Sequence, residues 1–179
     1  MFYCFLADGF EETEALAPVD ILRRAGIAVT TVGVGGSVIR GSHNIYVKAD
    51  ITADALELSD EIQGVILPGG MPGVKNLDAD QTVHAAIEFC DQRDLYVCAI
   101  CAAPSIIGRM GLLSGRKSTC FPGFEDALIG AQITGEKVVT DGTVITAKGA
   151  GCALEFGFAI VREVCGEEKA ASVAAAMQC

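Results

Sequence analysis

Cys101 is the residue of this chain whose setting is most typical of chemistry. It follows an apolar run at residues 95–100 that reads as a buried strand, and it precedes Ala102 and Ala103, which open a helical segment. A cysteine at such a sharp turn lies at a helix N-terminus, where free backbone N–H groups and the helix dipole stabilise a thiolate. Small residues on both sides let the turn close, as in nucleophile elbows. The pattern predicts a reactive thiol at the edge of a parallel sheet.

Two carboxylates near the start of the first predicted helix could assist that thiol. On a helical wheel of residues 11–25, Glu11 and Glu14 fall within the apolar arc, whereas Glu12 and Thr13 lie near the polar side. Burial would raise the pKa of both buried carboxyls, and a protonated acid could hold a thiolate or relay a proton. The alternative is that Glu11 merely caps the helix and that Glu14 reaches solvent from its first turn.

Paired glycines supply a third candidate feature. Gly69 and Gly70 follow a short apolar strand at residues 65–67, where they let a backbone N–H point at a ligand. The N–H of Gly70 could form an oxyanion hole with the N–H of Ala102. On their own, the paired glycines favour an ordinary turn.

Two other uses of the cysteine are disfavoured by the pattern. Cys101 completes a C-x-x-C with Cys98, but Cys98 lies inside the predicted strand, whereas a redox dithiol needs both cysteines at a helix start. A metal site is also not expected, because no second C-x-x-C is present and the chain has only two histidines, His43 and His84.

Alternating strands and helices are predicted to position these residues. The apolar runs and turn signals indicate strands at 2–7, 27–33, 38–48 (one or two short strands), 65–67, 95–100 and 117–120, a hairpin of 137–140 with 143–147, and helices at 11–25, 80–92, 101–111, 124–129, 153–164 and 167–177. This order predicts a doubly wound α/β sandwich with a mostly parallel sheet and a late β-hairpin. Sites in such sheets lie beyond the carboxyl ends of the strands, where all three candidate features fall.

The composition narrows the classes of function. The 179 residues suit one domain, 1–179, with an aliphatic core, because hydrophobic residues make up 51% and aromatic residues only 6%. A net charge of −10 argues against nucleic acid and against an anionic membrane as partners. No apolar run suits a membrane span, and no signal peptide is recognised. The eight cysteines are therefore expected to be mostly free thiols in a cytoplasmic protein.

Five segments in one register resemble the DJ-1/ThiJ/PfpI superfamily, and within it the branch of the parkinsonism-linked human protein and the bacterial YajL-like proteins. The segments are residues 6–26, 67–70, 99–104, 111–117 and 149–157. Each motif alone is modest, but their order and spacing make the match specific. The resemblance implies a flavodoxin-like three-layer sandwich, like that of class I glutamine amidotransferases, and usually a homodimer.

The resemblance also implies roles for individual residues. Cys101 is implied to be an acidic nucleophile that is easily oxidised to a sulfinate, with Glu14 as the buried acid hydrogen-bonded to its sulfur. Gly70 and Ala102 are implied to supply the oxyanion-hole amides, and Glu11 is implied to lie in the pocket. The residues expected to contact substrate are Glu11, Gly69, Phe121 and His43.

Two positions depart from the pattern of the superfamily. Many members have a histidine just before the proline that follows the nucleophile helix, where this chain has Phe121 before Pro122. A thiol–imidazole pair is therefore not available from that site, which argues against a protease. His43 stands where some relatives have an arginine near the dimer partner's pocket, so its role is open.

The leading hypothesis is an enzyme that acts on reactive dicarbonyls without a cofactor. The Cys101 thiolate would add to methylglyoxal, glyoxal or a glycation adduct to give a hemithioacetal, and Glu14 would move the proton. Its partners would be small reactive aldehydes or glycated substrates. The alternative is an oxidative-stress sensor or chaperone-like protein, whose accessible cysteine is oxidised without turnover.

Overall fold

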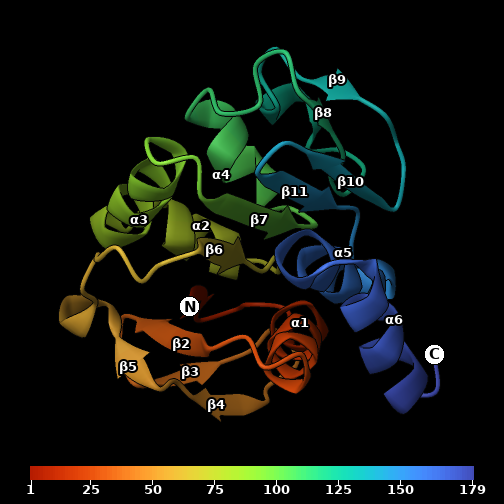
Figure 1. Cartoon of the computed structure of the whole chain (residues 1–179). Coiled ribbons are helices and arrows are strands. Elements are labelled where there is room, and N and C mark those ends of the chain that lie inside the picture. Colours follow the sequence, from red (N-terminus) through yellow and green to blue (C-terminus); the bar gives the residue numbers. More distant parts are fainter.

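A seven-stranded sheet runs through the middle of the molecule, whose computed structural model describes residues 1–179 (Figure 1). Every neighbouring pair of strands is parallel except the hairpin of β10 and β11. The hairpin turns at Gly142 and Thr143, one residue later than the predicted Asp141 and Gly142, because Asp141 still pairs with Val144. The strands lie in the order β10 (Val138–Asp141), β11 (Val144–Ala147), β7 (Tyr96–Ile100), β6 (Gly64–Leu67), β1 (Phe2–Ala7), β2 (Val29–Val34) and β5 (Ile51–Thr52).

Helices cover both faces of this sheet, which explains why β1 and β6 are apolar and buried along their whole length. One face carries α1 (Glu12–Arg24), α5 (Ala153–Cys165) and α6 (Glu167–Ala176), and the other carries α2 (Gly73–Asp78), α3 (Gln81–Asp91) and α4 (Pro104–Arg109). Each interface is filled by its own cluster of buried, mostly aliphatic side chains. The α/β sandwich with a mostly parallel sheet and a late hairpin is therefore confirmed.

Helix α1 positions the acidic residues and packs tightly on α5. It begins at Glu12 rather than at residue 11, and Pro18 lies inside it. The two helices approach each other at Gly157, where an added Cβ would lie 2.7 Å from Cδ1 of Ile21. Side chains of Ile21 and Leu22 complete the buried face that holds the helix against the sheet.

Several predicted elements are shorter than expected or pair differently. The predicted strand at 117–120 is reduced to β8 (Lys117–Ser118), which pairs with β9 (Gln132–Ile133) in a separate two-stranded sheet. The predicted helix at 124–129 is only a 3₁₀ turn at Glu125–Ala127, because left-handed glycines at 123 and 130 bound the segment. A second small sheet pairs β3 (Val38–Arg40) with β4 (Tyr46–Lys48).

The helix after Cys101 also starts later than predicted. Residues 101–103 form a turn, and α4 spans only Pro104–Arg109. None of the helices combines the length and the apolar composition that a membrane span requires.

Candidate active site

Three neighbouring strands deliver the candidate residues to one edge of the sheet. Strands β1, β6 and β7 lie side by side and parallel, so their carboxyl ends meet. The start of α1 follows β1, the paired glycines follow β6, and Cys101 follows β7. The chain therefore brings the predicted thiol, acid and glycine turn together at the carboxyl edge of the sheet.

Cys101 is held in an unusual backbone conformation. Its φ is 65°, in the left-handed region that costs a residue with a side chain about 1 kcal/mol or more. Two hydrogen bonds hold the turn: the N–H of Cys101 donates to the Ala147 carbonyl at 2.8 Å, and its own carbonyl accepts from the N–H of Phe121 at 2.8 Å. The predicted sharp turn is confirmed, and its thiol is partly exposed.

The other cysteines are placed differently from Cys101. All eight are free, and five of the remaining seven are buried, with only Cys165 and Cys179 exposed. Cys98 is fully buried inside β7, where burial raises the pKa of its thiol. The C-x-x-C spacing therefore does not form an exposed dithiol, in agreement with the prediction from sequence.

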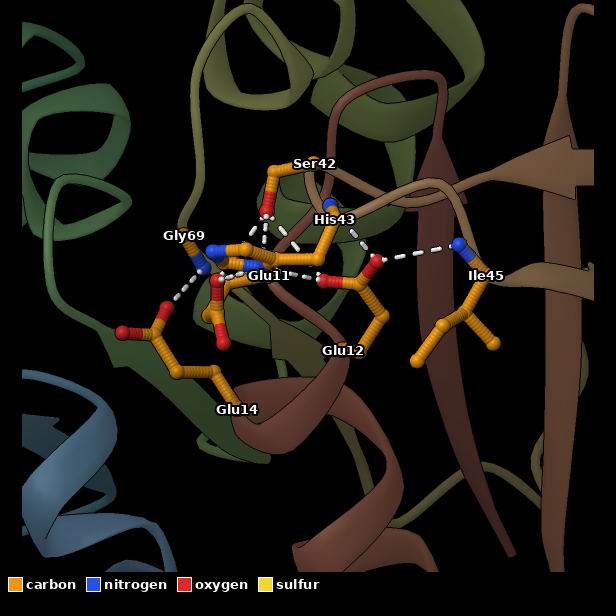
Figure 2. Close-up of polar contacts among 7 residues, drawn as sticks. All are labelled: Glu11, Glu12, Glu14, Ser42, His43, Ile45 and Gly69. Atoms are coloured by element: carbon orange, nitrogen blue, oxygen red, sulfur yellow. Dashed lines mark hydrogen bonds and ion pairs between the residues drawn. The ribbon is translucent and has the colours of Figure 1, made fainter.

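Glu14 is the acid that faces the thiol. Its side chain is 1% exposed, and its Oε2 accepts a hydrogen bond from the N–H of Gly69 at 2.9 Å (Figure 2). Burial raises the pKa of Glu14 to about 7, and hydrogen bonds from Cys101, Gly69 and Ala150 oppose that rise only in part. The burial predicted from the helical wheel is confirmed, which rules out the alternative that Glu14 reaches solvent.

The glycine turn lies against both reactive side chains. An added Cβ at Gly69 would lie 2.5 Å from Glu14 Oε2 and 2.6 Å from Cys101 Cβ, closer than real Cβ contacts. Gly70 has a φ of 89°, which only glycine adopts without strain, and there is no room for a side chain beside the Glu11 amide. The chain requires glycine at both positions so that its backbone can approach the thiol.

Opposing effects act on the thiol of Cys101. Burial, the charge of Glu14 and the hydrogen bond to Glu14 raise its pKa to about 12, while the amides of Ala102 and Gly70 lower it. The lowering expected from a helix N-terminus is thus outweighed by burial of the thiol and by the ionisable acid beside the sulfur. When Glu14 carries a proton this repulsion disappears, so the two side chains favour a state with one negative charge between them.

Glu12 corrects the helical-wheel prediction. It was expected near the polar side of α1, but it is 5% exposed and its carboxylate lies under the loop that joins β3 to β4. Oε1 accepts hydrogen bonds from the N–H groups of His43, at 2.8 Å, and Ile45, at 3.4 Å, and Oε2 lies 2.9 Å from His43 Nδ1 (Figure 2). Burial alone would raise the pKa of Glu12, but these hydrogen bonds lower it to about 2.

A distant loop explains why the wheel was wrong. The partners of Glu12 come from residues 42–45, and an added Cβ at Gly41 would lie 2.2 Å from Glu12 Oε1. The glycine therefore makes room for the carboxylate. A helical wheel assigns burial from the residues of the helix alone, so it does not include a distant loop that covers the first turn.

Glu11 and His43 lie beside the pair rather than in it. The N–H of Glu11 donates to the Gly69 carbonyl at 2.9 Å, and its Oε2 accepts a hydrogen bond from Ser42 Oγ at 3.0 Å. Its side chain makes no capping hydrogen bond, contrary to the alternative considered from sequence. The hydrogen bond to Glu12 raises the pKa of His43, whose ring lies 3.2 Å from Glu11 and makes no hydrogen bond to Cys101 or Glu14.

The same cluster is the one place where side chains could gather around a metal ion. Ligand atoms of Glu11, Glu12 and His43 lie within 4.8 Å of one another. Hydrogen bonds among these residues and Ser42 already account for the arrangement, so we assign no metal to it.

None of the surface pockets is lined by the Cys101 thiol. One of about 390 Å³ lies at the ends of β1 and β2 between Asp8 and Asn76, another of the same volume lies between Gly33 and Asp54, and Cys101 lines none of the four. A smaller one of about 240 Å³ lies between Ser42 and Met71, beside the acidic cluster. We place the site by the convergence of reactive groups, because concavity alone carries no chemistry.

Comparisons with known proteins agree with the fold and with these motifs. The model of the DJ-1/PfpI family matches residues 2–163. Protein dj-1beta of Drosophila melanogaster is 36% identical over 172 residues, covering 94% of this chain and 91% of that protein. A protein of Pyrococcus horikoshii named as a deglycase is 31% identical over 145 residues, covering 79% of this chain and 86% of that protein.

A solved structure extends the similarity to three dimensions. The structure of oxidized DJ-1 from Toxoplasma gondii has a TM-score of 0.93 and 28% sequence identity, and the alignment covers 99% of this chain and 97% of that one. The flavodoxin-like α/β sandwich that the resemblance implied is therefore confirmed along the whole chain.

Proposed function

The chain belongs to the DJ-1/PfpI family, and from that premise we propose that it is a cofactor-independent cysteine enzyme acting on reactive dicarbonyls or on the glycation adducts they form. The observation that carries the proposal is the contact of a partly exposed thiol with a buried acid and two backbone amides. The pKa of Glu14 is about 7, so at neutral pH this acid can both accept and donate a proton. The name of the Pyrococcus relative, a deglycase, supports the same class of substrate.

In the first step the sulfur of Cys101 attacks the aldehyde carbon of a dicarbonyl such as methylglyoxal. A carbon–sulfur bond forms, the carbonyl π-bond breaks, and its electron pair becomes an alkoxide. The N–H groups of Gly70 and Ala102, which face the sulfur, are placed to donate to that oxygen. Glu14, as the carboxylate, takes the thiol proton during the attack and returns it to the alkoxide, which gives a neutral hemithioacetal and leaves Glu14 ionised.

In the second step Glu14 moves a proton along the adduct. Its carboxylate removes the hydrogen of the former aldehyde carbon, and the electron pair of that C–H bond forms the double bond of an enediolate, whose oxygen on the neighbouring carbon takes up the hydroxyl proton. Glu14 then returns its proton to the neighbouring carbon, so that the former aldehyde carbon becomes the carbonyl of a lactate thioester. Water then hydrolyses the thioester, which releases lactate and restores the thiol. The sum is methylglyoxal plus water to lactate, and it consumes no oxidant, reductant or metal.

A second candidate function is favoured by the exposure of the same thiol. Cys101 is the half-buried cysteine beside an acid, and a solved relative is named as oxidized DJ-1. In this alternative the chain is an oxidative-stress sensor or chaperone-like protein, and Glu14 hydrogen-bonds a Cys101 sulfinate. It predicts that peroxide oxidises Cys101 ahead of the other seven cysteines, and peptide mapping that shows uniform oxidation would refute it.

Assembly and location belong to the same proposal. We expect a homodimer in the cytoplasm, and the exposure of Ile45 and Tyr46, at 54% and 65%, supports an apolar surface available to a second copy. Sedimentation of the purified protein tests the dimer.

Turnover of methylglyoxal tests the enzyme directly. Protein treated with a chelator is incubated with methylglyoxal, and lactate is followed by NMR beside Cys101→Ser and Glu14→Gln. The expected result is turnover by the wild type that is abolished in Cys101→Ser and reduced at least about a hundredfold in Glu14→Gln. Full activity in Cys101→Ser would refute the proposal.

A further inference from the structure

Two large apolar side chains are exposed at the rim of the cysteine site. Phe121 is 47% exposed, and its N–H donates to the carbonyl of Cys101 itself. Met71 is 44% exposed and directly follows Gly70, whose amide faces the Cys101 sulfur. Both side chains are therefore attached to backbone that contacts the nucleophile.

The backbone holds the ring of Phe121 in place. Its Cδ2 would lie 3.3 Å from a Cβ added at Gly149, so the ring packs over this glycine. The amide of the next residue, Ala150, contacts the carboxyl of Glu14. The Phe121 ring thus packs over the glycine that precedes Ala150, and the backbone N–H of Phe121 is hydrogen-bonded to the carbonyl of Cys101, so the ring stands beside the groups of the site.

The charges nearest to the thiol are negative. Glu14 is the charged side chain that acts on Cys101, and Glu11 in turn acts on Glu14; no lysine or arginine contributes. The imidazole of His43 lies 3.2 Å from Glu11 and 2.9 Å from Glu12, so it is already paired with the carboxylates of its own cluster. An anionic group entering the site would meet the carboxylates of Glu14 and Glu11 without a lysine or arginine of this chain to pair with.

We infer that the site selects uncharged dicarbonyls that carry an apolar or aromatic substituent, with Phe121 and Met71 holding that substituent, and that it rejects anionic 2-oxo acids. The inference rests on the proposed function and names its substrate class. The carbonyl oxygen takes the Gly70 and Ala102 amides, and the substituent lies against the exposed ring. Stacking on an aromatic face stabilises such a substituent, whereas a carboxylate there has nothing to pair with.

Competing substrates test the class of substituent. We would measure kcat/KM for phenylglyoxal, methylglyoxal and glyoxylate in the wild type, in Phe121→Ala and in Ile129→Ala, a control that removes another exposed apolar side chain, 58% exposed. The expected result is a phenylglyoxal to methylglyoxal ratio that falls about fivefold to tenfold in Phe121→Ala and stays unchanged in the control. An unchanged ratio in Phe121→Ala, with methylglyoxal turnover retained, would overturn the inference while leaving the proposed function intact.

Alkylation of the thiol tests the rejection of anions without any turnover. Neutral iodoacetamide and anionic iodoacetate differ in charge at nearly equal size, and peptide mapping reports the reaction at Cys101 alone. We expect the rate with iodoacetamide divided by the rate with iodoacetate to be about tenfold or more higher at Cys101 than for free cysteine. In Glu14→Gln this ratio should fall towards the value of free cysteine. A ratio equal to that of free cysteine would overturn the inference. If the protein turns over no dicarbonyl but still reacts much faster with iodoacetamide than with iodoacetate, the proposed function is refuted. The selectivity of the site against anions would still stand.

Discussion

Replacing Gly69 with alanine is expected to push the Cys101 thiol away from the Glu14 carboxyl by adding one methyl group. The new Cβ would lie 2.5 Å from Glu14 Oε2, 2.6 Å from Cys101 Cβ and 3.1 Å from its sulfur. Ordinary van der Waals contact begins near 3.4 Å, so the structure must open by almost 1 Å along this line. The φ of Gly69 is not in the left-handed region, so the effect comes from the side chain and not from the backbone.

The magnitude follows from that displacement. A misplacement of about 1 Å between reacting groups costs about a hundredfold in rate, and overpacking of this kind costs about 1–3 kcal/mol of folding stability. Gly69→Ala is therefore expected to lower the rate of methylglyoxal conversion about a hundredfold while the protein still folds. Its N–H is retained, so the loss cannot be assigned to the hydrogen bond with Glu14.

The assay compares Gly69→Ala with Gly151→Ala. An added Cβ at Gly151 meets nothing within 4 Å, and this glycine follows Ala150, so it is a neighbour of the site without the steric conflict. Rates of methylglyoxal conversion and of Cys101 alkylation are measured with thermal unfolding of each variant. Wild-type rates in a folded Gly69→Ala protein would refute the close approach of thiol, acid and glycine.

The remaining predictions concern the buried acids. Because the pKa of Glu14 is raised to about 7, above the ordinary value near 4.5, the ionised carboxylate destabilises the fold increasingly as the pH rises from about 4.5 to 7. Glu14→Gln should therefore be more stable than the wild type by about 1–3 kcal/mol at pH 8, with the difference fading towards pH 4, in denaturant titrations at several pH values. In the same variant the alkylation of Cys101 should reach half its maximal rate at a lower pH, because the charge that raises the thiol pKa is gone; an upward shift would contradict this cause. The ionised carboxylate of Glu12 has the opposite effect on folding stability. Because its pKa is lowered to about 2, it stabilises the fold fully above pH 4.5, and this stabilisation is lost as the pH falls through 2. Glu12→Gln should lose about 1–3 kcal/mol at pH 7 and much less near pH 2, and equal losses at both pH values would count against the hydrogen bonds to its carboxylate.

The elements that position the thiol were predictable because their signals are local. Strand β7 is a continuous apolar run, and the small residues after it let the chain turn tightly at Cys101. The burial of Glu14 followed from its place on the apolar arc of α1, and the fold followed from the alternation of strands and helices. The catalytic roles of these residues stay proposals.

The parts that sequence reasoning missed depend on contacts between distant segments. Glu12 is buried by a loop some thirty residues away, and neither helix periodicity nor charge could indicate its partners. The raised pKa of Cys101 reflects its burial first and then the charge and hydrogen bond of Glu14, which comes from a distant helix. Strand β8 pairs with β9 across an irregular connection, so its length could not be read from its own residues.

The bond between Cys101 and its substrate is the most direct test of the account. Wild-type protein would be mixed with methylglyoxal labelled with carbon-13 at the aldehyde carbon, and the label would be followed by NMR alongside Cys101→Ser. The account predicts a protein-bound hemithioacetal carbon that is absent in Cys101→Ser and that passes into the carboxylate of lactate as the signal decays. Lactate formed at the wild-type rate by Cys101→Ser, or formed by the wild type while the thiol is fully blocked, would contradict it.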